Sequence, residues 1–195
     1  MSKAVLCAVA MAFPLAAAAV PERYTLDPYH SFPYFEVDHF GVSILRGLFR
    51  KSSGKFTIDR AAKYGAVEIT VETASVDTGD SDKGSRPRSR DEHLRAADFF
   101  NVAEFPRMTF KSTAVKFAGD NPAEITGNLT LLGVTRPLAL KIERWVCRDN
   151  PASKRPMCGG NASASMKRSD FGMKYGIPAV SDELKLSFVF EGYKD

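Results

Sequence analysis

The stretch AVEITVET, residues 66–73, decides the fold class of this chain. Val67, Ile69 and Val71 alternate with Glu, Thr and Glu, which is a strict period of two. Successive side chains of a β-strand point to opposite faces, so this pattern predicts a strand with one buried and one solvated face.

The same alternation recurs along most of the sequence. Short connections rich in Gly, Pro, Asn and Asp separate the alternating segments, as in repeated β-hairpins. The pattern predicts roughly eight strands and an antiparallel all-β fold, either a sandwich or a barrel. Besides the opening stretch, the alternating segments are 32–40, 54–59, 107–113, 124–131, 136–143, 161–167 and 183–191.

One segment departs from this pattern. SRDEHLRAADFF, residues 89–100, places Leu94 and Ala97 on one side at helical spacing, and Ser89 or Asp91 is a candidate N-cap. We expect one short helix inserted between strands.

A polar loop precedes this helix. GDSDKGSRPRSR, residues 79–90, carries Lys83, Arg86, Arg88 and Arg90, the one local concentration of positive charge. We interpret it as a mobile, solvated loop, with contact to an anionic head group or membrane surface as the alternative.

The N-terminus reads as a targeting segment. Lys3 precedes an apolar run over residues 5–15, and three alanines at 17–19 offer a cleavage site. Residues 1–19 therefore resemble a secretory signal peptide more than a transmembrane anchor, because the run is shorter than the ~20 residues that span a bilayer. Residues 20–195 are predicted to form one domain.

Two cysteines remain after such cleavage, Cys147 and Cys158. In an exported protein this pair predicts one disulfide that joins two flanking strands, with a metal pair or free thiols as alternatives. The full chain has a formal net charge of +4 with basic and acidic residues interleaved, which gives no support for nucleic-acid binding.

No catalytic or metal-binding constellation stands out. The three histidines, His30, His39 and His93, lack the short spacing of a metal site, and no G-x-S-x-G motif occurs. Asp170-Phe171-Gly172 spells a kinase triplet, but no phosphate loop or H-R-D motif accompanies it. We therefore predict that Asp170 accepts hydrogen bonds that fix a strand end, that Phe171 packs inward and that Gly172 frees the backbone.

A wider set of motifs resembles the YceI-like family of exported bacterial proteins. The matching segments follow in family order and cover almost all of the chain from residue 24 to 191: YTLDPYHSFPYFEVDHFGVSILRGLF (24–49), VDTGD (76–80), RDEHLRAADFFNVAEFPRMTFKST (90–113), GNLTLLGVTRPLAL (127–140) and RSDFGMKYG with VSDELKL (168–176, 180–186). The linker near residues 80–90 and the excursion between the two cysteines look like additions to the family pattern.

The resemblance implies a lipocalin-like eight-stranded antiparallel barrel that holds an amphiphilic ligand. Members of the family bind polyisoprenoids, isoprenoid quinones or fatty-acid-like lipids in the periplasm or outside the cell, and some are linked to stress responses. It also implies a Gram-negative source. A second copy of the chain, in a homodimer, and a membrane cytochrome b561 are the possible partners. His30 and His39 are expected to hold turns through hydrogen bonds to backbone. No further cofactor or metal is expected.

Three functional hypotheses follow: a lipid carrier, an accessory quinone-binding protein for a membrane cytochrome, and an enzyme acting on isoprenoids. Periodicity alone leaves open whether the barrel is filled or hollow. The residues predicted to face a ligand are Phe35, Val37, Phe56, Ile69, Val71, Leu94, Phe99, Phe100, Met108, Phe110, Leu129, Leu131, Leu140, Leu186 and Phe188.

Overall fold

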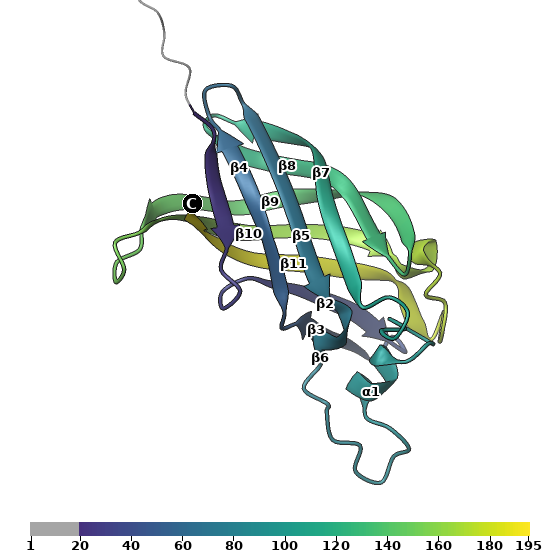
Figure 1. Cartoon of the computed structure of the whole chain (residues 1–195). Coiled ribbons are helices and arrows are strands. Elements are labelled where there is room, and N and C mark those ends of the chain that lie inside the picture. Colours follow the sequence, from purple (N-terminus) through teal and green to yellow (C-terminus); the bar gives the residue numbers. More distant parts are fainter. Residues whose placement is uncertain (1–19) are drawn as a thin grey trace, which may run out of the picture.

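The computed structural model of the chain describes residues 20–195, so the predicted signal peptide lies outside the described residues. This part folds as an all-β structure, a closed eight-stranded antiparallel barrel with one short α-helix at one end (Figure 1). Of the two all-β architectures that the alternation predicts, the barrel is the one observed.

The structure contains more strands than the eight predicted. The strands are β1 (Glu22–Leu26), β2 (Phe32–His39), β3 (Ser43–Phe49), β4 (Ser52–Asp59), β5 (Tyr64–Glu72), β6 (Val76–Asp77), β7 (Arg107–Ala118), β8 (Asn121–Leu131), β9 (Val134–Asp149), β10 (Pro156–Lys167) and β11 (Val180–Lys194). The helical elements are η1 (Thr73–Ser75), α1 (Arg90–Arg95) and η2 (Arg168–Phe171).

The barrel closes where the first strand meets the last. Strands β1, β4, β5, β7, β8, β9, β10 and β11 follow one another around the wall, and β1 pairs with both β4 and β11. The closing ladder with β11 includes Thr25 opposite Tyr193 and Leu26 opposite Gly192. A Cβ atom at Gly192 would lie 2.5 Å from the Phe56 ring, so glycine here allows that ring to lie against the seam.

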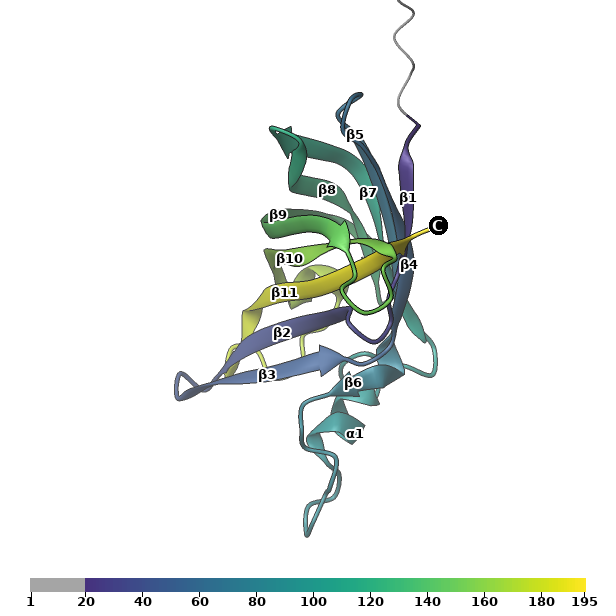
Figure 2. The ribbon, with the colours of Figure 1, turned by 90° about the vertical axis from the view of Figure 1, so that its left-hand side faces the viewer.

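The edge of β11 is divided between two partners. Its last residues pair with β1, whereas residues from Val180 to Val189 pair with β2. The β2–β3 hairpin therefore continues the wall at the other end of the barrel and projects from it (Figure 2), and β6 pairs with β3 there. Strands β1, β3 and β6 are the three that sequence periodicity did not predict, because they are short or apolar on both faces.

The predicted helix is confirmed, but it is shorter than the segment 89–100 that suggested it. Ser89 caps α1: its hydroxyl accepts a hydrogen bond from the Glu92 backbone, and the Glu92 side chain accepts one from the Ser89 backbone. This capping box fixes the first turn. After Arg95 the chain continues through turns that bury Phe100.

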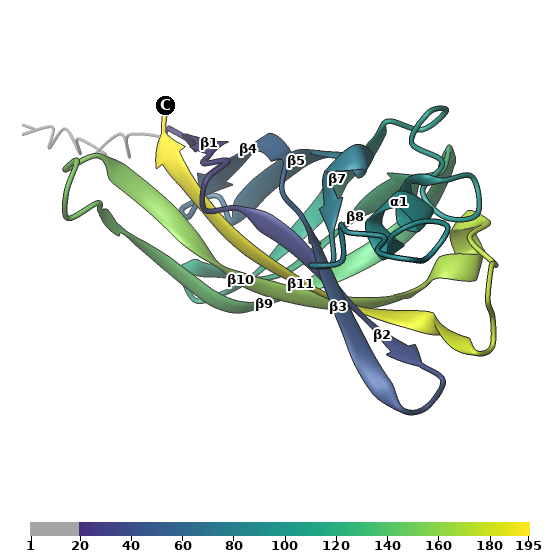
Figure 3. The ribbon, with the colours of Figure 1, turned by 90° about the horizontal axis from the view of Figure 1, so that it is seen from below.

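The long β9–β10 hairpin extends to one side of the barrel, as seen from below (Figure 3). Cys147 and Cys158 lie opposite each other in this ladder and form the predicted disulfide. No helix within residues 20–195 is both long enough and apolar enough to cross a membrane.

Candidate functional site: an apolar lumen with a polar entrance

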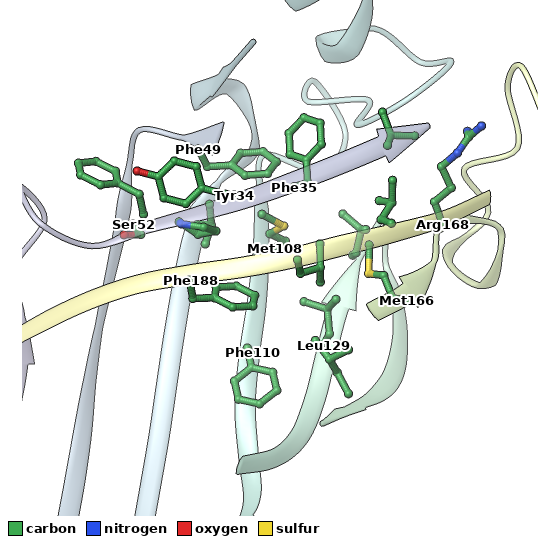
Figure 4. A pocket seen from close by; sticks show the side chains of 18 of the residues that line it. Tyr34, Phe35, Phe49, Ser52, Met108, Phe110, Leu129, Met166, Arg168 and Phe188 are labelled. Atoms are coloured by element: carbon green, nitrogen blue, oxygen red, sulfur yellow. The ribbon is translucent and has the colours of Figure 1, made fainter. Parts of the chain in front are cut away.

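The barrel encloses a cavity of about 560 Å³. Volumes of this size are typical of small-molecule sites. Side chains from β2, β7, β8 and β11 converge in the lumen (Figure 4), where Phe188, Phe110 and Leu129 lie between Arg168 at one end and Ser52 toward the other. The barrel is therefore hollow rather than filled, which decides the question that periodicity left open.

Every residue predicted to face a ligand lines this cavity. Alternation placed the strand residues among them on the inner face, because a strand without a bulge keeps its parity from end to end. Leu94, Phe99 and Phe100, from the helical segment, were expected to line or cover one end. The structure thus confirms their position, while their contact with a ligand stays a prediction. They are Phe35, Val37, Phe56, Ile69, Val71, Leu94, Phe99, Phe100, Met108, Phe110, Leu129, Leu131, Leu140, Leu186 and Phe188.

The entrance is the end of the cavity where exposed side chains still line it. Phe40, at the tip of the β2–β3 hairpin, is 61% exposed, and Tyr175, in the loop after η2, is 51% exposed. The Phe40 backbone N–H donates to the Ala179 carbonyl at 2.7 Å, which joins the hairpin to that loop. Two segments far apart in the sequence thereby share one rim.

Aromatic contacts tie the helix to the same rim. The His93 ring lies 4.9 Å from the Phe99 ring and 5.0 Å from the Tyr175 ring, centroid to centroid, and the Phe99 and Tyr175 rings lie 5.4 Å apart. All three side chains line the cavity. The α1 segment therefore covers the entrance and is held to the loop after η2 by edge-on ring contacts.

Basic side chains gather at the entrance, and sequence reasoning did not predict them as lining residues. His39, Arg46, Arg90, His93 and Arg168 line the cavity there. Among the described residues that line the lumen there is no Asp, Glu or Cys side chain. The rim of the cavity thus offers basic and aromatic groups.

The basic loop is partly neutralised by its own acids. Arg86 donates two hydrogen bonds to Asp80, at 2.6 and 2.8 Å, and these lower the pKa of the Asp80 carboxyl. Asp98 accepts a hydrogen bond from His93 at 2.9 Å and another from Arg88 at 3.0 Å. Both lower the pKa of the Asp98 carboxyl, and the bond from His93 has the larger effect. These pairs are solvent-accessible, so each contributes little to stability.

The other end of the lumen is closed by aromatic side chains. Tyr24 and Phe56 stack with their centroids 4.9 Å apart, and both are buried. Trp145 lies 5.7 Å from Phe56 and 5.7 Å from Phe190, centroid to centroid. We call Tyr24, Phe56, Trp145 and Phe190 the aromatic end of the barrel.

Comparison with known proteins agrees with this geometry. The model of the YceI-like domain matches residues 24–192. The chain belongs to the YceI-like family. Protein YceI of Salmonella arizonae is 39% identical over 179 residues, covering 90% of this chain and 88% of that protein. The UPF0312 protein of Pseudomonas aeruginosa is 38% identical over 199 residues, covering 100% of both chains.

Solved structures of similar fold support the assignment. Burkholderia cenocepacia BcnA superposes with a TM-score of 0.67 at 25% identity, covering 85% of this chain and 98% of that one. A polyisoprenoid binding domain from Saccharophagus degradans, implicated in plant cell wall breakdown, superposes with a TM-score of 0.62 at 19% identity, covering 88% of this chain and 98% of that one. At that identity the second match supports the fold alone.

The YceI-like segment around residues 168–176 is built differently from the prediction. Asp170 is exposed. The hydrogen bonds at this turn go to Asp182 instead: its carboxylate accepts one from the Ser169 backbone N–H at 2.8 Å and one from the Ser169 hydroxyl at 2.7 Å. The expectation for Asp170 was therefore wrong, because the side chain that reaches back to this turn comes from the next strand. Phe171 is buried and Gly172 has φ of 88°, as predicted.

Arg168 is the residue that organises this turn. Its side chain is 2% exposed, and its guanidinium donates to the backbone carbonyls of Ser181, Tyr175 and Val180 at 2.8 Å and of Met173 at 3.3 Å. Burial lowers its pKa, and the charge of Asp182 opposes that shift. Arg168 thus holds the loop that forms one side of the entrance.

His30 was predicted to hold a turn through a hydrogen bond to backbone, but its ring bonds to a carboxylate. His30 Nδ1 lies 2.8 Å from Asp27 Oδ2, which raises the pKa of His30, and His93 pairs with Asp98. Asp27, His30 and Glu191 bring ligand atoms within 4.8 Å of one another, but His30 is exposed and its bond to Asp27 accounts for its orientation. We assign no metal to them.

Proposed function

We propose that this YceI-like domain is a binding protein that holds an amphiphilic lipid, such as an isoprenoid, a quinone or a fatty-acid-like molecule, in its lumen. The observation that carries the proposal is the cavity of about 560 Å³ with apolar strand faces along its length and polar groups at one rim. Such a site selects by apolar area and shape. Transport, storage and sequestration all use the same interaction.

The apolar walls supply the driving force. Burial of apolar surface contributes about 25 cal/mol per Å², so a tail that loses about 400 Å² of exposed surface gains roughly 10 kcal/mol before its costs. Loss of translational freedom and of chain entropy removes at least ~4 kcal/mol of that gain. The remainder, at most about 6 kcal/mol, corresponds to a dissociation constant of tens of micromolar or weaker.

The fold neighbour from Saccharophagus degradans is described as a polyisoprenoid binding domain, and our proposal extends this ligand class to the present chain. Binding is the function we favour because the described lining residues are mostly apolar. We place the protein in the periplasm or outside the cell, since the predicted signal peptide and the Cys147–Cys158 disulfide both suit an oxidising compartment.

Native mass spectrometry combined with organic extraction tests this proposal. The mature chain, purified from its own host without detergent, is expected to carry an apolar small molecule at about one copy per cavity. Denaturation should release that molecule for identification. A protein that is well folded and yet carries no lipid, and that takes up none from a host lipid extract, would refute the proposal.

A second candidate is an accessory role for a membrane cytochrome, with a quinone as the bound lipid. The observation that favours it is the apolar tip of the β2–β3 hairpin beside the entrance, where Phe40 and Val42 are 61% and 84% exposed. Co-purification with a cytochrome, together with a redox effect that requires the quinone, is the expected result. Homodimerisation stays a prediction that sedimentation of the purified protein tests.

A further inference from the structure

One buried hydrogen-bond donor at the aromatic end has no partner among the described residues. Trp145 lines the cavity at the aromatic end, and its indole Nε1 is the one buried side-chain nitrogen or oxygen within residues 20–195 that lacks a hydrogen-bond partner. A buried donor left unpaired costs about 1–3 kcal/mol, and such groups are rare in native proteins. This atom therefore points to a partner that the chain itself does not supply.

Neither the neighbouring rings nor the nearby hydroxyls replace that partner. Phe56 and Phe190 surround Trp145 with edge-on and tilted rings, and an N–H contact with an aromatic face is only a second-order interaction. The serine hydroxyls that line the cavity are already engaged: Ser31 Oγ donates to the Glu191 carbonyl at 3.0 Å, and Ser52 Oγ donates to the Ser31 carbonyl at 2.6 Å. The Tyr34 hydroxyl also lines the cavity and forms no hydrogen bond with the Trp145 indole.

Trp145 lies far from the cations of the entrance. It is opposite Gly160 on β10, and Gly160 is opposite Phe190 on β11. Arg168 follows β10 at its other end, eight positions after Gly160, which corresponds to about 25 Å along the strand. An anionic group at Trp145 would thus be buried without a countercharge, which is costly. Burial of a neutral acceptor that receives the indole hydrogen bond does not carry that cost.

We propose that Trp145 Nε1 donates a hydrogen bond to a neutral acceptor oxygen on the end of the ligand that reaches the aromatic end of the lumen. This narrows the ligand class to lipids that carry an acceptor oxygen at that end. A quinone carbonyl, an amide oxygen or an ester oxygen can accept the hydrogen bond, and a plain hydrocarbon end cannot. The inference rests on the proposed lipid-binding function and adds a recognition element to it.

A matched pair of ligands tests the inference. Decyl-benzoquinone and decylbenzene share ring size and tail, but only the quinone carries acceptor oxygens. Their dissociation constants are measured by calorimetry for the unchanged protein and for Trp145→Phe, which keeps an aromatic ring and removes the N–H. We expect the substitution to weaken quinone binding about tenfold, the size of one buried hydrogen bond, and to change decylbenzene binding less than twofold.

An equal change for both ligands, or no change for the quinone, would overturn the inference while leaving lipid binding intact. Failure of both ligands to bind the unchanged protein would overturn the proposed function, and the inference with it.

A second measurement avoids any folding defect of the variant. The chain contains one tryptophan, so a ¹⁵N-labelled sample gives one indole N–H resonance. We expect this resonance to move downfield with decyl-benzoquinone and not with decylbenzene. An indole resonance that responds alike to both ligands would count against the hydrogen bond.

Discussion

Filling the lumen at Ala162 should abolish lipid binding without unfolding the barrel. Ala162 is a buried, small residue of the cavity wall on β10, and its cross-strand neighbours are Phe188 on β11 and Ile142 on β9, which also line the cavity. In Ala162→Phe a ring enters the space between those side chains. The substitution therefore competes directly with any tail that occupies the lumen.

The expected magnitude follows from the area of the ring. A buried phenylalanine covers about 150–250 Å², so the ring displaces roughly 150 Å² of ligand contact. At about 25 cal/mol per Å² this is a loss of about 4 kcal/mol of binding free energy, close to a thousandfold in the dissociation constant. The protein itself should change little in stability, because the ring enters a cavity of about 560 Å³ rather than a packed core.

The assay combines ligand occupancy with thermal unfolding. Ala139→Phe serves as the matched control, since Ala139 lies on β9 between Leu138 and Leu140 but is exposed on the outer face. We expect Ala162→Phe to be purified empty and Ala139→Phe to retain its lipid. An occupied Ala162→Phe variant with unchanged affinity would refute the assignment of the lumen as the site. A loss of about 1–3 kcal/mol of unfolding free energy would instead indicate a packed interior.

Other substitutions test the supporting structure. Replacing Cys147 and Cys158 with Ser should lower the unfolding free energy by about 2–3 kcal/mol, measured by denaturant titration, because the disulfide closes a short loop; equal stability with and without reductant would contradict this. The hydrogen bonds from Ser169 lower the pKa of Asp182 in the folded protein. The contribution of Asp182 to the free energy of unfolding is therefore complete above its ordinary pKa of about 4, and it is lost as the pH falls below that value. The melting-temperature difference between the unchanged protein and Asp182→Asn should therefore shrink below about pH 4, and a difference that grows on acidification would show the wrong sign. Asp170→Asn should leave the melting temperature unchanged within error, since Asp170 is exposed; a large loss would restore it as the anchor of the turn.

Alternation in the sequence predicted the wall of the lumen well, because strands such as β5 are apolar on one face only. Val67 and Val71 could be oriented from their neighbours alone. β3 was harder, since Leu45 and Phe49 line the cavity while Ile44 on the opposite face is also apolar and exposed. A strand that is apolar on both faces carries no period of two, so its pairing is set by neighbours far along the chain.

The residues that sequence reasoning missed act through long-range contacts. The predicted strand at 136–143 ended at Glu143, yet β9 continues to Asp149 and carries Trp145 into the aromatic end. Arg168 lies two residues before Asp170 in the sequence. The burial of Arg168 depends on backbone carbonyls of residues 173–181, which fold over its guanidinium. A partly buried tryptophan or a buried arginine is rarely visible as such in one sequence, because its partners are not local.

Closure of the barrel by β1 and β11 also sets an order for its folding. Thr25 Oγ1 donates to Asp195 Oδ1 across 170 positions of sequence, so the two strands of the seam come from opposite ends of the described chain. Contacts of such separation form slowly, because their loop-closure entropy must be overcome first. During synthesis β1 emerges early and its free edge has no partner until β11 is complete, which leaves an open strand edge of the kind that promotes aggregation. The hairpins from β7 to β10 pair locally and need not wait, so the final event in building the lumen is the joining of its first and last strands.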